Sequence, residues 1–360
     1  MLNALLRHRT LVVLFVLALI IKFVALKPAW VESLYSTGIY PVISKLLRFV
    51  LGWIPFSIGD ILYVAAGAWF VWKAVKYFSL LVKRKIREYL TWILLVKLIK
   101  LVLWIYIVFN LFWGLNYDRE GIAGQLHLVK QPYDTVIVKK LAMKLSLQLN
   151  AVAGRVDSVD RLRFNKNTAL FAQARQDYKE AATRFPFINY SPASIKPSLY
   201  GTMGKYFGYT GYYNPFTGEG QLKTSIPVFI KPFVINHEIA HQLGYAKENE
   251  ASFVSYLVCT SSKEPSVQYS AYFEMFDYAM AELRFVRDTA FTKTIITSLH
   301  PRVKQDIREL RAYRINTDNV VAPVMGEAYE RYLKLNNQPE GHRSYNEVIG
   351  WLVAYLKNEL

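Results

Sequence analysis

One five-residue segment carries the spacing of a hydrolytic metal site: His237-Glu238-Ile239-Ala240-His241. Two histidines four positions apart lie on one face of a helix, where both imidazoles can bind a single Zn²⁺. Glu238 lies about 100° around the same helix, near enough to take a proton from a metal-bound water. The segment therefore predicts a zinc site that activates water for hydrolysis.

A catalytic zinc has three protein ligands and one open position for water, so a third ligand is needed. Glu248 and Glu250 both stand at the start of a second apolar helix, expected at about Asn249–Cys259. Glu248 is favoured because Ala251, one turn on, lets the second helix pack close to the first; Glu250 is the alternative. Ser252, four residues after Glu248, is expected to hydrogen-bond a metal ligand from behind.

The sequence also marks the limits of the HExxH helix. Pro232 suits a first helical turn, and Gly244 falls where a C-terminal cap would end the helix. Ile235, Ile239 and Leu243 recur every four residues on the side opposite the histidines. This spacing predicts a helix with an apolar back and a polar front.

A stretch rich in tyrosine and glycine, residues 191–229, precedes this helix, and its composition predicts strands and turns. A peptidase holds its substrate extended along a sheet edge through main-chain hydrogen bonds. We expect Tyr212–Gln221 to form that edge, with four substrate-binding residues: Tyr212, Tyr213, Asn214 and Phe216. Asn214 or Tyr213 is also a candidate for stabilising an oxyanion.

These motifs carry a family resemblance. The HExxH segment followed by Glu248 and Ala251 resembles the gluzincin branch of zinc metallopeptidases, whose third ligand is a glutamate on a following helix. More closely, the chain resembles an uncharacterised family of bacterial membrane zincins of unknown function, through Pro55–Asp60, Gly211–Glu219, His237–Ala251 and Ser344-Tyr345. The resemblance covers nearly the whole chain and implies a fold and a metal site, but no substrate.

A gluzincin-like site also implies a transition-state donor from a later histidine or tyrosine. Tyr345 is the predicted donor, from the resemblance of the Ser-Tyr pair, and His342 and His300 are the other downstream candidates. Cys259 is the only cysteine, so no intrachain disulfide can form. We expect Cys259 to be buried in the core.

The amino-terminal third, residues 1–116, predicts a membrane domain. Three apolar segments, at about residues 10–27, 59–79 and 92–113, approach the roughly 20 residues that span a bilayer. Basic residues precede the first segment and cluster between the second and third, whereas the loop between the first two holds few. By the positive-inside rule, the amino terminus is cytoplasmic and residues 117–360 form a periplasmic domain at a bacterial inner membrane.

Most of the net charge of +17 also comes from the predicted membrane domain. Residues 1–116 hold 14 Lys and Arg against 3 Asp and Glu, or +11, whereas the remainder holds 30 against 24, or +6. Most of the excess is therefore a topology signal or a contact with anionic lipid. No nucleic-acid motif accompanies the charge, so no nucleic-acid partner is predicted.

Together these features predict an α+β protein. Three transmembrane helices precede a zincin-like domain with a small mixed sheet, active-site helices, amphipathic helices at Asp134–Ala153 and Asn167–Arg184, and a helical C-terminal part. The predicted function is a zinc metallopeptidase that hydrolyses peptides or proteins at the outer face of the inner membrane, with the lipid bilayer as its other partner. The alternative is a zinc-binding but non-proteolytic membrane protein that acts as an envelope assembly or scaffold factor.

Overall fold

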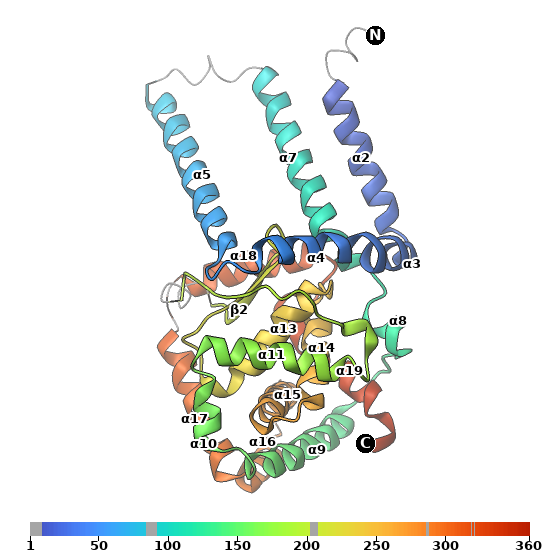
Figure 1. The fold of residues 1–360 in the computed structure, drawn as a ribbon, viewed down its shortest axis with the longest axis vertical. Coiled ribbons are helices and arrows are strands. Elements are labelled where there is room, and N and C mark those ends of the chain that lie inside the picture. Colours follow the sequence, from blue (N-terminus) through green and yellow to red (C-terminus); the bar gives the residue numbers. More distant parts are fainter. Residues whose placement is uncertain (1–8, 84–91, 202–207, 286–287, 318, 320) are drawn as a thin grey trace.

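Three apolar helices project from one side of a mostly helical domain (Figure 1): α2 (Arg9–Ala25), α5 (Ile58–Val82) and α7 (Trp92–Phe112). The computed structural model describes residues 9–83, 92–201, 208–285, 288–317, 319 and 321–360. Within these ranges, α5 and α7 are long and apolar enough to cross a membrane. The predicted first span passes only as a pair, Arg9–Ala25 with Pro28–Leu51, bent by 103°. Two or three spans thus agree with the structure.

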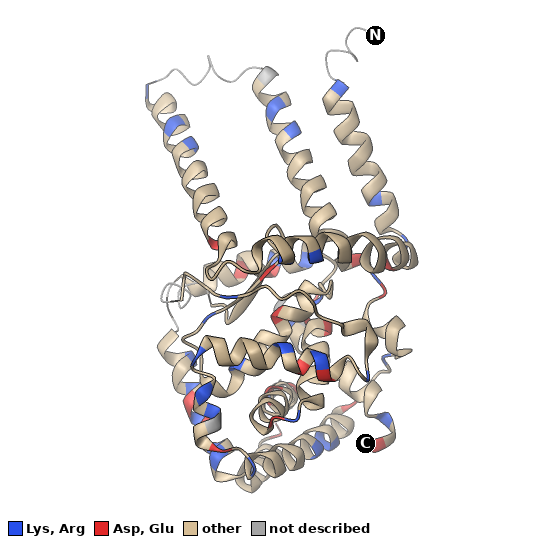
Figure 2. Ribbon diagram, viewed as in Figure 1, with Lys and Arg blue, Asp and Glu red and all other residues tan. Residues whose placement is uncertain are grey.

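The basic residues of α5 and α7 lie away from the domain, whereas α2 also carries Lys22 in its last turn, at the end next to the domain (Figure 2). Lys73 and Lys76 stand in the later half of α5, and Lys97 and Lys100 in the first half of α7. The opposite ends of these two helices join the domain (Figure 1). Part of the predicted basic loop, residues 84–91, lies outside the described residues.

A continuous helical stretch runs across the base of the three helices: α3 (Pro28–Trp30), η1 (Val31–Ile39) and α4 (Tyr40–Leu51) (Figure 1). On α4, the residues buried against the domain are Tyr40, Ser44 and Arg48, four positions apart. The opposite face is apolar and exposed, and it includes Val42, Leu46 and Phe49. This stretch, expected as a loop of the membrane domain, instead packs on the domain with the apolar face outward, as in helices that lie in the membrane interface.

The domain after α7 is built mainly from helices around a core in which α15 packs against α9, α13 and α14. The predicted helices at Asp134–Ala153 and Asn167–Arg184 are confirmed as α9 and α11, and Cys259 in α14 is fully buried as expected. The helical elements are η2 (Gly114–Asp118), α8 (Ile122–Leu126), α9 (Thr135–Ala153), α10 (Ser158–Arg163), α11 (Asn167–Ala181), η3 (Pro186–Ile188), η4 (Val228–Ile230), α13 (Lys231–Gln242), α14 (Glu248–Ser261), α15 (Pro265–Phe285), α16 (Thr289–Ser298), α17 (Pro301–Thr317), α18 (Ala322–Leu335), η5 (Gly341–Tyr345), α19 (Val348–Tyr355) and η6 (Lys357–Glu359).

A small mixed sheet lies within the predicted strand-and-turn stretch, of which residues 202–207 fall outside the described part. Its three strands are β1 (Ile195–Pro197), β2 (Gly211–Asn214) and β3 (Glu219–Leu222), in the order β1-β3-β2. The central β3 pairs in parallel with β1 and antiparallel with β2. In this described sheet β2 is therefore an edge strand, whereas Glu219–Gln221 of the predicted edge Tyr212–Gln221 belong to the central β3, which is paired on both sides.

One buried carboxylate fixes α5 to this sheet. Glu219 of β3 accepts hydrogen bonds from the backbone N–H of Gly59 at 2.7 Å and of Ile58 at 3.1 Å. The Thr217 hydroxyl donates to the same carboxylate at 2.9 Å. An anion at a helix N-terminus is stabilised by the free N–H groups and the helix dipole. Two of the segments that carry the family resemblance therefore meet here, where an apolar helix joins the small sheet.

Candidate metal centre

The HExxH helix is α13, which has the limits expected from the sequence. Pro232 lies in its first turn, and Gly244 follows its end with φ of +91°, a conformation that suits glycine. All its residues are buried, the histidines included. The predicted polar front is therefore covered by other parts of the protein and is not exposed on the surface.

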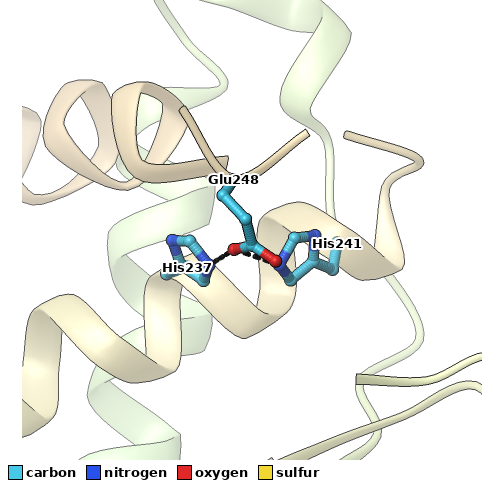
Figure 3. Close-up of side chains that lie close together, drawn as sticks. All are labelled: His237, His241 and Glu248. Atoms are coloured by element: carbon cyan, nitrogen blue, oxygen red, sulfur yellow. Dashed lines mark hydrogen bonds and ion pairs between the residues drawn. The ribbon is translucent and has the colours of Figure 1, made fainter. Parts of the chain in front are cut away.

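The imidazoles of His237 and His241 converge with the carboxylate of Glu248, the first residue of α14 (Figure 3). Glu248 Oε2 lies 3.0 Å from His237 Nε2 and 3.4 Å from His241 Nε2. Four ligands placed tetrahedrally at about 2.0–2.2 Å from Zn²⁺ are separated from one another by roughly 3.3 Å. The three donor atoms, which all lie within 4.8 Å of one another, therefore fit one zinc ion.

Each ligand is held from behind by a second group. His241 Nδ1 lies 2.7 Å from the carbonyl of Tyr245, and His237 Nδ1 lies 3.2 Å from Ser252 Oγ. The Tyr329 hydroxyl donates to Glu248 Oε1 at 2.6 Å. This arrangement leaves both Nε2 atoms and one carboxylate oxygen directed at a common point, which is typical of metal sites with oriented ligands. Ser252 has the position expected of it, whereas Tyr329 was not predicted.

The buried charges of the centre favour a cation. Burial alone raises the pKa of Glu248, but the neighbouring His241 and His237 outweigh burial and hold that pKa well below its usual range. For His241 burial lowers the pKa, and the Glu248 carboxylate more than reverses this, raising it to about 9. The carboxylate is thus ionised in a nearly dry site, where an unpaired charge is costly. A metal cation or an imidazolium next to the carboxylate compensates this charge.

Glu238 lies between the metal ligands and the edge strand. It is 4% exposed, and burial, together with the charge of Glu248, raises its pKa to about 8 against the opposing effect of His241. Its Oε2 atom is buried and has no hydrogen-bond partner in the part of the chain that the structure describes. A Cβ atom added at Gly211 of β2 would lie 2.6 Å from Glu238 Oε1, so the glycine lets the strand approach this closely.

A cavity of about 300 Å³ opens above the three ligands and Glu238. Four predicted residues line it: Tyr212, Tyr213, Phe216 and Tyr345. Most of the other lining side chains are aromatic and were not predicted, namely Tyr63, Phe109, Trp113, Tyr117, Tyr329 and Tyr332. Their signal in the sequence is weak, because tyrosine and tryptophan on an amphipathic or membrane helix are more often packing or interface residues.

Two predicted candidates lie elsewhere. Glu250, the alternative third ligand, points toward Gly121, and its carboxylate is 3.9 Å from Lys247 Nζ. Asn214 is fully buried, its Oδ1 accepts a hydrogen bond from the Phe216 N–H at 3.0 Å, and it does not line the cavity. The described structure therefore brings Glu248 to the histidines, and leaves Tyr213 as the remaining one of the two oxyanion candidates in the pocket.

Of the downstream donors whose side chains the structure describes, Tyr345 alone lines the cavity. Its ring stacks on that of His237 with centroids 6.3 Å apart, and its hydroxyl lies 3.5 Å from that of Tyr329. His300 precedes α17 and is not a lining residue, and the side chain of His342 lies outside the described part of the chain.

The comparisons with known proteins give one result. The family described as "Protein of unknown function (DUF3810)" matches residues 35–353. No curated protein and no solved structure matches the chain. The matched range contains α4, the sheet and every ligand of the candidate centre, but its description names no chemistry. The resemblance to zincins therefore stays a prediction.

Proposed function

The chain belongs to the DUF3810 family of proteins of unknown function, and from its metal centre we propose that it is a membrane-anchored zinc metallopeptidase. One observation carries the proposal: two histidines, a glutamate ligand, a free buried carboxylate and a sheet edge converge on a single cavity. Metal-assisted hydrolysis uses the ligands and the carboxylate, and an extended peptide substrate uses the sheet edge.

The chain's own residues have distinct parts in this chemistry. His237, His241 and Glu248 would hold the zinc ion, which when bound would polarise a water molecule and the substrate carbonyl. Glu238 accepts a proton from the water as the water oxygen attacks the carbonyl carbon. It then passes that proton to the leaving amine as the C–N bond breaks. Tyr345, beside His237, is the proposed donor to the developing oxyanion. The products are a carboxylate and an amine.

The edge strand β2 supplies the proposed substrate site. Tyr212 and Tyr213 lie on this strand, and with Phe216 they line the cavity next to Glu238. An extended peptide that pairs with a free strand edge is positioned by main-chain hydrogen bonds, while side-chain pockets set its specificity. This favours a peptide bond as the target.

We place the domain on the outer face of a bacterial inner membrane. Basic residues lie on α5 and α7 toward the ends remote from the domain, and basic flanks mark the cytoplasmic side of a membrane protein. This orientation makes the domain periplasmic, with the lipid bilayer as a constant partner.

A zinc-binding scaffold without hydrolytic activity is the second candidate. The set of three ligands alone supports the scaffold and the enzyme equally. Glu238 separates the two, because a purely structural zinc site has four protein ligands and no use for a buried carboxyl without a partner. That observation favours the enzyme.

The test uses the full-length protein purified in detergent. The parent and Glu250→Gln should each hold about one zinc ion per chain, and Glu248→Ala should lose it. Glu238→Gln should keep zinc and lose the cleavage of a mixed peptide library by at least about a hundredfold. If the Glu248→Ala variant retains zinc, Glu248 is not a zinc ligand. A zinc-loaded parent that cuts no more than Glu238→Gln would leave the scaffold function.

A further inference from the structure

The wall of the metal cavity continues into the apolar helices. Tyr63, in the second turn of α5, and Phe109 and Trp113, at the end of α7, line the cavity together with the metal ligands. The ring of Tyr63 stacks on that of Tyr212 of β2, with centroids 6.4 Å apart. The proposed substrate strand and a helix able to cross a membrane therefore share one wall of the site.

The level of the bilayer surface is marked by α4. Its outward residues Val42, Leu46 and Phe49 are between 60% and 72% exposed, although all three are apolar. A helix of this kind lies in the interface with its apolar face among the lipids. On its other face, the Tyr40 hydroxyl lies 3.1 Å from that of Tyr213 in the cavity wall. The cavity is thus directly beneath the bilayer surface, one side chain away from α4.

One helix beside the cavity, α5, is exposed along most of its length in the part of the chain that the structure describes. In α5, the buried residues are Gly59 and Asp60, and most residues that follow Tyr63 are exposed in the described structure. By contrast, α2 and α7 pack on each other and bury Leu14 and Ile107. A Cβ atom added at Gly67, one turn above Tyr63, would meet no described atom within 4 Å. Small residues let helices approach closely in membranes, so this flank suits a second helix.

We propose that the substrate is a membrane-anchored polypeptide. Its apolar helix packs on the flank of α5 that carries Tyr63 and Gly67, and the extended segment next to that helix enters the cavity along β2. The inference rests on the proposed hydrolysis and adds the substrate class: the bond that is cut lies within a few residues of the bilayer surface. A soluble peptide would need only β2 and the metal centre.

The first test compares two peptide libraries with the full-length protein in phosphatidylcholine liposomes. Both contain the same short randomised segments, and one has these segments joined to a leucine-rich helix of about 20 residues. Anchoring also raises the local concentration of any peptide, so the deciding comparison is between two variants. Gly67→Trp fills the open flank above Tyr63, whereas Ala65→Trp places the same bulk on the opposite face of α5.

We expect Gly67→Trp to cut the anchored library about tenfold more slowly than the parent, because the large side chain prevents the close approach of a second helix. Ala65→Trp should match the parent. Both variants should keep their zinc and cut the soluble library at the parent rate.

The second test measures binding without turnover. Cys259 is fully buried, so a cysteine introduced at Gly67 or Ala65 in the Glu238→Gln protein is the reactive one. A single cysteine near the end of the probe helix should form a disulfide with Gly67→Cys in much higher yield than with Ala65→Cys.

The outcomes separate this inference from the proposed function. Equal cleavage of the anchored library by the two tryptophan variants, or equal disulfide yields, would overturn the inference and leave hydrolysis in place. No cleavage of either library by the zinc-loaded parent would overturn both.

Discussion

Replacing Tyr329 with phenylalanine should weaken zinc binding without moving the helices that carry the ligands. The Tyr329 hydroxyl donates to Glu248 Oε1 at 2.6 Å, behind the oxygen that faces the histidines. Glu248 is 4% exposed, so water has little access to replace the lost donor. The variant removes one oxygen atom from a helix 81 positions away along the chain.

The magnitude follows from two independent rules. A hydrogen bond to a charged group contributes about 1.5–3 kcal/mol. Mutation of a residue that orients a metal ligand lowers metal affinity by about 10–100-fold, which corresponds to about 1.4–2.7 kcal/mol. The two ranges overlap, so we expect the zinc Kd of Tyr329→Phe to rise by roughly 10–100-fold. Competition with a chromophoric chelator, on the full-length protein in detergent, measures this change.

Tyr332→Phe is the matched control. Tyr332 lies one turn further along α18, and its ring stacks on that of Tyr329 with centroids 5.9 Å apart. Its hydroxyl pairs with that of Tyr117 at 3.0 Å and with no metal ligand in the described structure. We expect its zinc affinity to stay within about threefold of the parent. Equal losses in both variants, or none in Tyr329→Phe, would refute the reasoning.

Three further changes probe the same framework. Ser252→Ala removes the oxygen 3.2 Å from His237 Nδ1 and should weaken zinc binding by about tenfold in the same titration. Gly211→Ala places a methyl group 2.6 Å from Glu238 Oε1, and it should lower peptide cleavage by at least about a hundredfold while the zinc content holds. Asp177 is 1% exposed, and burial raises its pKa to about 6, above the roughly 3.9 of an unfolded aspartate. The stability that its protonated form contributes is therefore complete below about pH 4 and is lost as the pH rises through about 6. Asp177→Asn should remove roughly 2–3 kcal/mol of this pH dependence, measured by thermal unfolding from pH 4 to 7, and an unchanged slope would contradict the assignment.

The sequence was informative about the metal helix because its signals are local. Pro232, the four-residue spacing of His237 and His241, and Gly244 all lie within a single helix and its cap, where periodicity and capping rules apply directly. The next helix could be placed for the same reason. Glu248 and Glu250 could not be separated, because two positions at a helix start differ by about 200° in direction, and only the packing angle of the helices decides which faces the histidines.

Other parts of the site depend on contacts that no local pattern encodes. Tyr329 reaches Glu248 from α18, and its only signal was a tyrosine on an amphipathic helix. On α4 the four-residue spacing of Tyr40, Ser44 and Arg48 indicates a helix, but the buried face is the one with the polar groups. Hydrophobicity predicts the buried face only where the other side is water, and here the apolar face is directed toward the side from which the membrane helices rise.

The position of α4 makes the candidate metal centre and the apolar helices one structural unit. The last carbonyl groups of a helix have no partners within it. For α13, residues of α4 supply part of the missing hydrogen-bond partners. Ser44 Oγ donates to the Gln242 carbonyl at 2.7 Å, and the Tyr40 hydroxyl lies 3.3 Å from the carbonyl of His241. The turn after α13 is held in the same way, since Arg119 donates to the Gly244 carbonyl at 3.0 Å while it pairs with Glu32 of η1.

A fragment that begins at Tyr117 would therefore lack the groups that cap the HExxH helix and the partner of a nearly buried arginine. Removal of one member of a buried ion pair costs about 3–5 kcal/mol, a large share of the stability of an ordinary domain. The same contacts fix α4 relative to the histidines. A site that only needed to bind zinc could sit anywhere in the domain. On the proposed function, capping the HExxH helix with α4 would keep the cavity at the membrane, where an anchored substrate would meet it.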